Sequence, residues 1–344
     1  MSQHRIQLLS ARGGLYETFD YRAVSADRRI TFILRHTLFR PLWNQPGYVE
    51  VALLAFEQGK AVTRCIVERE DLSAGHRKLL ARAADWEGLV FSFASGSFFE
   101  IGPDRLRGKL HTADGAAEWH CTLQGRDESL DLLPADYWYE LPWPGHKVAL
   151  RDCFLKFQGR FTVDNLTVDG ELSGANLHYW GNGYPYEYAA AQCSHFEEDP
   201  GACFYGVTTR LRLGRIVKSP YLSLAALKLR GRWHRFNEVS GLMRHRLEAL
   251  DNYRWRVTFL NRDVGLEVDV DGANPRMLPW AAWHSDHPYG SRGVMKVTPY
   301  ARAELTLFDR KTHETLATLT SSAAELKTLL PENLPESAGF LAGA

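Results

Sequence analysis

Short stretches in which apolar and polar residues alternate follow one another along most of the chain. These stretches are rich in β-branched and aromatic residues and are bounded by Gly, Asp, Asn or Pro, a pattern typical of β-strands separated by turns. The clearest cover residues 29–38, 48–57, 89–94, 118–123, 153–163, 253–260 and 266–270. Many short strands with few helical segments predict an all-β protein built of antiparallel β-barrels or sandwiches.

Two segments have helical spacing instead. Residues 76–86 place leucines and alanines three to four positions apart after Ser73, a suitable N-terminal cap. Residues 321–330, SSAAELKTLL, read as a second amphipathic segment that Pro331 closes. We expect a short helix at each.

The length of 344 residues favours two domains, each able to bury a core. Hairpin or linker signals occur at Asp164-Asn165 and Asp169-Gly170. We therefore expect one β domain over residues 1–168, a second one packed against it over 169–331, and a loosely held tail over 332–344.

Charge and cysteine usage narrow the possible partners. Lys plus Arg equals Asp plus Glu at 41 each, so no global field attracts nucleic acid, and we expect no nucleic-acid partner. The five cysteines show no Cys-x-x-Cys spacing, and no signal-like apolar segment follows the start. These features predict a cytoplasmic protein and leave open its oligomeric state and peripheral contact with a membrane.

Known nucleotide-binding and hydrolase motifs are absent from the sequence. It contains no phosphate-binding Gly-x-x-x-x-Gly-Lys, no Gly-x-Ser-x-Gly turn and no convincing dinucleotide fingerprint. His284, Asp286 and His287 have a spacing that could hold a metal, although such histidines more often bond locally. We therefore expect neither a cofactor nor a metal.

Chemistry-bearing residues concentrate between Asn176 and Phe196, NLHYWGNGYPYEYAAAQCSHF. The Gly181-Asn182-Gly183 turn lets the chain reverse sharply. In a strand after it, residues 184, 186, 188, 190, 192 and 194 would share one face, and 187, 189, 191, 193 and 195 the other. Aromatic strands of this kind most often pack in a core, but one face could line a pocket.

Part of this segment resembles a known family. Trp180-Gly181, Gly183, Tyr184-Pro185 and then Gln192-Cys193 look like the Trp-Gly-x-Gly-aromatic-Pro turn and Gln-Cys strand of tocopherol cyclase-like proteins. The stretch from Gly170 to Gly181 resembles a junction shared with carotenoid 1,2-hydratases, and residues 17–21 match the first strand of that family more weakly. The resemblance implies two lipocalin-like β domains and a cofactor-free cyclase, hydratase or isomerase acting on a hydrophobic polyene, terpenoid or prenylated aromatic.

That chemistry needs a proton donor in an aromatic pocket, where burial lets a carboxyl group hold its proton and aromatic faces stabilise a cation. By position, the candidate catalytic residues are Glu187, His178, Tyr179 and Glu17. The candidate substrate-binding residues, at the junction of the domains, are Trp180, Tyr184, Tyr186, Gln192, His195, Trp283 and His284.

The sequence also departs from the family. Hydratase-like members carry an acidic residue just before Trp-Gly, where this chain has Leu177, His178 and Tyr179, and Asp20 beside Tyr21 replaces a tyrosine of the first strand. A non-catalytic carrier that binds a hydrophobic small molecule is therefore the alternative function.

Structural alternatives also stand beside the catalytic ones. Glu187 could face solvent or pair with His195, Gln192 could bridge the two barrels, and His178 and Tyr179 could bond across the junction.

Overall fold

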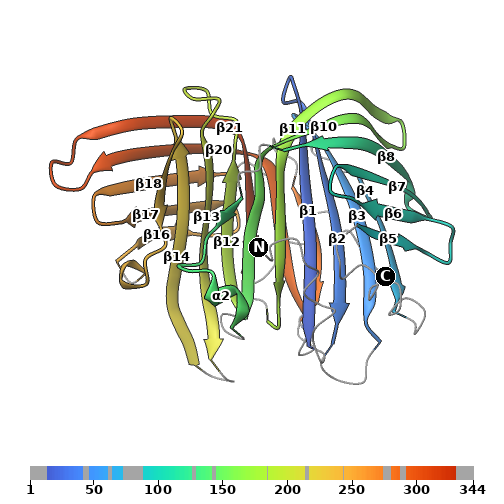
Figure 1. Cartoon of the computed structure of the whole chain (residues 1–344), viewed down its shortest axis with the longest axis horizontal. Coiled ribbons are helices and arrows are strands. Elements are labelled where there is room, and N and C mark those ends of the chain that lie inside the picture. The colour runs from blue at the N-terminus through green and yellow to red at the C-terminus, as the bar shows by residue number, and fades with distance from the viewer. Residues whose placement is uncertain are drawn as a thin grey trace.

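The computed structural model describes residues 14–41, 46–60, 64–72, 88–125, 129–141, 145–183, 185–213, 217–242, 244–273, 280–286 and 292–330. These residues form two antiparallel sheets that curl and stand side by side, so the all-β prediction is confirmed (Figure 1). Helical structure in them is limited to α2 (Tyr137–Glu140) and a 3-10 turn, η3 (Val239–Gly241). No helix in the described ranges is long and apolar enough to cross a membrane.

The first sheet runs from one edge to the other in the order β4 (Arg64–Asp71), β3 (Tyr48–Glu57), β2 (Ile30–Arg40), β1 (Leu15–Ser25), β11 (Leu166–Gly181), β10 (His146–Val163), β8 (Gly115–Gln124), β7 (Arg105–Thr112), β6 (Phe98–Ile101) and β5 (Leu89–Ser92), with β9 (Leu130–Asp131) on β10. The second sheet has the order β15 (Arg232–Phe236), β14 (Val217–Leu229), β13 (Cys203–Leu213), β12 (Glu187–Cys193), β21 (Thr315–Leu329), β20 (Arg292–Asp309), β18 (Val264–Asp271), β17 (Arg254–Leu260) and β16 (Arg246–Leu250), with β19 (Ala281–Asp286) on β20.

The two sheets are wound alike. In each, the first strand pairs with both the second strand and the last, and a short extra strand pairs with the penultimate one. The chain passes from the first sheet to the second over residues 182–186, between β11 and β12. The expected boundary at 168/169 falls within β11, and whether each sheet folds as an independent domain stays a prediction.

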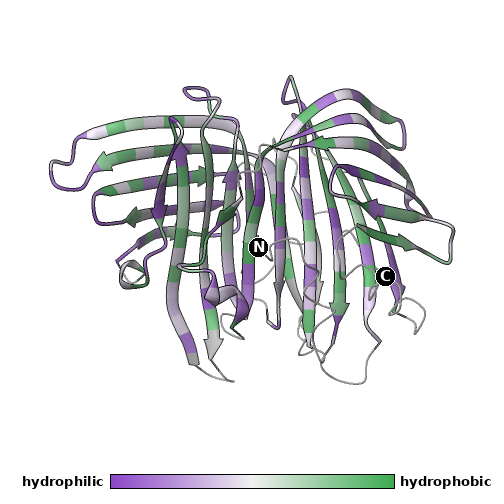
Figure 2. Cartoon of the chain, viewed as in Figure 1, coloured by the Kyte–Doolittle hydropathy of each residue, from purple (hydrophilic) through white to green (hydrophobic). Residues whose placement is uncertain are grey.

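Burial along the strands follows from this arrangement. Hydrophobic and hydrophilic residues alternate along many strands (Figure 2), and β7 alternates exposed and buried residues because one of its faces meets solvent. Strands β1, β2 and β12 are buried almost throughout, since one face packs inside its own curled sheet and the other faces the opposite sheet.

An apolar cluster formed by residues of both sheets fills the space between them. It joins Tyr16 and Tyr179 of the first sheet to Tyr188, Tyr205 and Met295 of the second. Polar residues on the outward face of β1 therefore lie buried at the junction rather than in solvent.

The helix expected over residues 321–330 is wrong, because these residues belong to β21. The segment has helix-forming Ala, Leu, Glu and Lys, but it pairs with β12 on one side and β20 on the other. Hydrogen bonds to two neighbouring strands outweigh a weak local propensity. The helix expected over 76–86 and the tail 332–344 lie outside the described residues.

Candidate functional site

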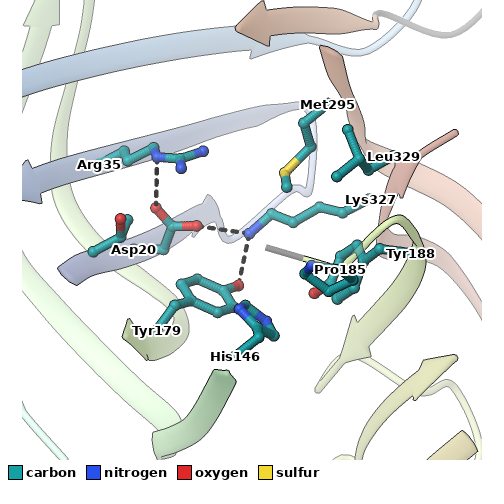
Figure 3. A pocket seen from close by; sticks show the side chains of 10 residues that line it. Asp20, Arg35, His146, Tyr179, Pro185, Tyr188, Met295, Lys327 and Leu329 are labelled. Carbon is teal, nitrogen blue, oxygen red and sulfur yellow. Dashed lines mark hydrogen bonds and ion pairs between the residues drawn. The ribbon is translucent and has the colours of Figure 1, made fainter. Parts of the chain in front are cut away.

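A small polar pocket lies between the two sheets, as Figure 3 shows. Its lining combines Asp20, Arg35, Tyr179 and His146 of the first sheet with Lys327 of the second. Thr18, Pro185, Tyr188, Met295 and Leu329 complete the wall. Its volume of about 20 Å³ is enough for one water-sized group.

Lys327 is the centre of this pocket. Its Nζ lies 2.8 Å from Asp20 Oδ2, 2.9 Å from Glu325 Oε1 and 3.0 Å from the Tyr179 hydroxyl. Although Lys327 is 3% exposed, the nearby carboxylates hold its pKa above the usual range against the opposing effect of burial. Three oxygens thus use all three N–H donors of the ammonium group.

The Lys327 contacts define how Tyr179 can act. Because an ammonium group only donates, the Tyr179 oxygen accepts this bond, which leaves its own O–H proton to be donated to a ligand. Burial and the neighbouring Asp20 raise the pKa of Tyr179 well above its usual value. Tyr179 therefore stays a phenol and serves as a hydrogen-bond donor at the pocket.

Asp20 is the hydrogen-bond acceptor that the pocket offers to a ligand. Its Oδ2 accepts from Lys327, whereas Oδ1 has no hydrogen-bond partner among the described residues and lies 4.0 Å from Arg35 Nε. The ionic side chains that line the pocket are thus two cations, Arg35 and Lys327, and one anion. Glu325 does not line the pocket but is paired with Lys327, so the buried charges around the pocket are two cations and two anions.

His146 separates this pocket from a larger apolar cavity of about 90 Å³. The apolar cavity is lined by Leu132, Leu133, Pro134, Trp138, Val148, Val207, Thr209, Leu211, Leu222, Leu224, Val239 and Leu242, together with His146. Burial lowers the pKa of His146 to about 4, so the imidazole is neutral near pH 7, and its Nδ1 contacts the Tyr16 hydroxyl. A ligand with a small polar group and an apolar body would match the two adjoining spaces.

The residues expected to be catalytic lie in three separate places. Tyr179 lines the junction pocket, whereas Glu17 and His178 lie inside the curl of the first sheet, each 0% exposed. His178 Nδ1 is 2.7 Å from Arg151, which can only donate, so His178 Nε2 carries the proton given to Glu17 Oε1 at 2.7 Å. Both ring nitrogens of His178 are therefore engaged.

Glu187 is 6% exposed, so the solvent-facing alternative for it is wrong. Its carboxylate accepts a hydrogen bond from Tyr221 and lies 3.5 Å from Arg210 and 4.0 Å from Lys218. It lies on the opposite face of β12 from Tyr188, because neighbouring residues of a strand point to opposite sides. The expected pairing of Glu187 with His195 is also wrong, since the partner of His195 is Ser173 at 2.9 Å.

The expected binding residues are similarly divided. Trp180 stacks on His178 at 4.5 Å and on Tyr139 at 5.5 Å, and Tyr186 lies beneath Lys218. Gln192 accepts from Arg22 across the junction, which confirms the bridging alternative. Tyr184 lies outside the described residues, as do the side chains of Trp283 and His284, whose backbone belongs to β19.

Sequence reasoning missed Lys327, Glu325, Arg35 and His146. The helical interpretation of 321–330 concealed the first two, although Glu-x-Lys between apolar neighbours in a strand would have indicated a charged pair on one buried face. Asp20 was noticed only as a departure from a family pattern.

No family model matches the chain, and no curated protein sequence is similar to it. Several solved structures are similar to it at 9% sequence identity. CghA with Sch210972 has a TM-score of 0.52 over 92% of this chain and 88% of the other. A putative AttH from Nitrosomonas europaea has a TM-score of 0.49 over 92% of both chains, and kievitone hydratase from Nectria haematococca has 0.47 over 92% and 89%.

The likeness to CghA shows that this chain has the same two-sheet β fold. The tocopherol cyclase-like and carotenoid hydratase-like resemblance stays a prediction.

Proposed function

We propose that this protein is an enzyme that performs acid/base chemistry on a small hydrophobic molecule carrying a carbonyl group, as an isomerase or lyase. The observation that carries the proposal is the pairing of a donor, Tyr179, with an acceptor, Asp20 Oδ1, in a polar pocket that adjoins an apolar cavity. The likeness to CghA, which was solved with Sch210972, is compatible with a small-molecule ligand.

In the proposed reaction the substrate carbonyl oxygen occupies the polar pocket and accepts the Tyr179 proton as a hydrogen bond. Asp20 removes a proton from the carbon next to the carbonyl, and the negative charge that develops on oxygen is stabilised by Tyr179 and by the one positive charge left in excess when Asp20 is protonated. Asp20 then returns the proton to another carbon in an isomerase, or to a departing hydroxyl group in a lyase.

Negative charge fits this pocket better than the carbocation that the family resemblance implies. Arg35 and Lys327 are balanced by Asp20 and Glu325 at rest, but once Asp20 takes the proton one positive charge is in excess, which stabilises an anion on the substrate and repels a cation. Neutral His146 stands at the entrance to the apolar cavity and would orient the body of the substrate.

Deuterium incorporation tests the proposal directly. Purified protein is incubated in D₂O with a panel of hydrophobic unsaturated and β-hydroxy ketones, and with any small molecule extracted from it, and exchange at carbon is followed by mass spectrometry. Asp20→Asn should slow exchange about 10²–10⁴-fold by loss of the base, and Tyr179→Phe about 10²–10³-fold by loss of the donor. Urea unfolding of each variant gives the folded fraction for normalisation.

Glu187→Gln is the matched control, because it neutralises another buried carboxylate that does not line the pocket. We expect its exchange rate within a few-fold of wild type; a loss as large as that of Asp20→Asn would instead support Glu187 as the proton donor. Wild-type rates in both Asp20→Asn and Tyr179→Phe would refute the proposed roles.

A non-catalytic carrier is the second candidate function, favoured by the apolar cavity alone. Tight binding of panel compounds by the wild-type protein, without exchange at any carbon, would support the carrier over the enzyme.

A further inference from the structure

Lys296 is a second buried lysine of the second sheet, but it lacks the oxygen partners that surround Lys327. It is 3% exposed, and its Nζ has no hydrogen-bond partner among the described residues. Two other buried amines contrast with it: Lys327 meets three oxygens, and Lys147 donates to the carbonyl oxygens of Tyr139 and Leu141.

The position of Lys296 separates it from the junction pocket. In the ladder between β20 and β21, Lys296 pairs with Thr328 and Val297 pairs with Lys327. Since neighbouring residues of a strand point to opposite faces, Lys327 faces the junction and Lys296 faces the inside of the curled second sheet.

The described neighbours of Lys296 are neutral. Its Nζ lies 4.9 Å from the centre of the Tyr253 ring, which in turn packs edge-on against Trp280 at 5.3 Å. Its partners in the ladder are Ala282 and Thr328, and none of the ion pairs found among the described residues involves it. With no carboxylate among its described neighbours, the charged form of the amine has only the Tyr253 ring to stabilise it, which is weaker support than the two carboxylates give Lys327.

A buried amine beside an aromatic wall has the properties of a nucleophile. Desolvation lowers the pKa of Lys296, which increases the fraction present as the neutral amine near pH 7. Amines of this kind attack carbonyl carbons, whereas fully paired lysines such as Lys327 are held as ammonium ions.

We propose that Lys296 is a site of reversible imine formation with small apolar aldehydes or ketones, on the inner face of the second sheet beside Tyr253 and Trp280. The amine nitrogen bonds to the carbonyl carbon and a proton moves from nitrogen to oxygen, which gives a carbinolamine. Loss of water from the carbinolamine then gives the imine, and nothing is oxidised or reduced.

Reductive trapping tests this proposal. The full chain is incubated at pH 7 with butanal and sodium cyanoborohydride, which reduces an imine to a stable butylamine, and the adducts are mapped by peptide mass spectrometry. A lowered pKa raises the fraction of neutral amine, so we expect Lys296 to be trapped several-fold faster than exposed Lys60 and Lys156. Trapping at the exposed lysines with Lys296 unmodified would overturn the proposal.

Two variants separate a reactive amine from a structural cation. Lys296→Met should abolish the fast adduct and leave the urea midpoint unchanged or higher, because it removes an amine that has no hydrogen-bond partner. Lys147→Met is the control and should lower the midpoint, because two buried carbonyl oxygens lose their donor. A fast adduct that persists in Lys296→Met, or a fall in its midpoint as large as in the control, would contradict the proposed site.

Discussion

At the scale of single residues, the buried ionic network around Lys327 is the costliest feature of the junction. Lys327, Asp20 and Glu325 are each no more than 3% exposed, yet they come from positions as far as 307 residues apart. Taking charges out of water is expensive, and only close pairing offsets that cost. Loss of one partner therefore leaves an uncompensated buried charge.

Lys327→Met should lower the free energy of unfolding by about 3–5 kcal/mol, because it strands the carboxylates of Asp20 and Glu325. Urea unfolding monitored by tryptophan fluorescence measures the change. Lys156→Met is the matched control: its pair with Glu171 is about half exposed on both sides and should contribute about 0–1 kcal/mol. Equal, small losses in the two variants would contradict the buried network.

Adding Asp20→Asn and Glu325→Gln to Lys327→Met should recover part of that loss, since the stranded charges are then removed. No recovery would mean that the Lys327 side chain stabilises the fold by packing instead of by charge.

At the scale of elements, β1 holds the two sheets together through Arg22. This side chain is 2% exposed and donates to Gln192 of β12 at 2.9 Å, to the Pro299 carbonyl oxygen at 3.1 Å and to that of Ala323 at 2.7 Å. Pro299 and Ala323 lie at irregularities in the pairing of β20 with β21, where regular ladder bonds are interrupted. Arg22 thus donates hydrogen bonds to carbonyl groups that lie where the strand pairing of the second sheet is interrupted.

Arg22→Met should lower the free energy of unfolding by about 3–5 kcal/mol, because three buried acceptors lose a charged donor. Hydrogen exchange should also quicken locally, at residues 299–301 and 321–324. Arg160→Met removes a solvent-exposed pair with Asp169 and is expected to leave both readouts unchanged. Exchange that rises evenly through both sheets would argue against a local role for Arg22.

At the scale of the whole molecule, buried neutral histidines make stability depend on pH. Burial lowers the pKa of His36 to about 3 and that of His146 to about 4, from an ordinary 6.5. Between pH 6.5 and about 4 the unfolded chain therefore binds more protons than the folded one, so stability falls as the pH falls.

Each of these two histidines should contribute a slope of up to about 1.4 kcal/mol per pH unit over that range. Urea midpoints between pH 7.5 and 5 measure it. His36→Phe should flatten the dependence, because the ring lies among the aromatic side chains of Tyr21, Phe99 and Trp119. Exposed His111→Phe serves as the control, and the same slope in both variants would exclude His36 as a source.

The sequence by itself determined the all-β class and which side chains share a face of β12. Alternation with a period of two is a local property, so it placed Tyr188 and Ala190 on one face and Ala189 and Ala191 on the other. The structure confirms this, because Tyr188 and Ala190 belong to the apolar cluster between the sheets and Ala189 and Ala191 to a separate cluster. For Gln192 the sequence left two alternatives, ligand binding and a bridge between the halves, and the structure shows the bridge.

Only the tertiary structure decided which faces meet. Residues 321–329 became a strand because β12 and β20 bind them on both sides, and the site formed where Asp20, Tyr179 and Lys327 converge from three distant strands. A local pattern fixes the period of an element, whereas the pairing of charges across a junction depends on how two sheets pack. For that reason the sequence indicated the region of the pocket and one of its residues, Tyr179, but not the lysine that organises it.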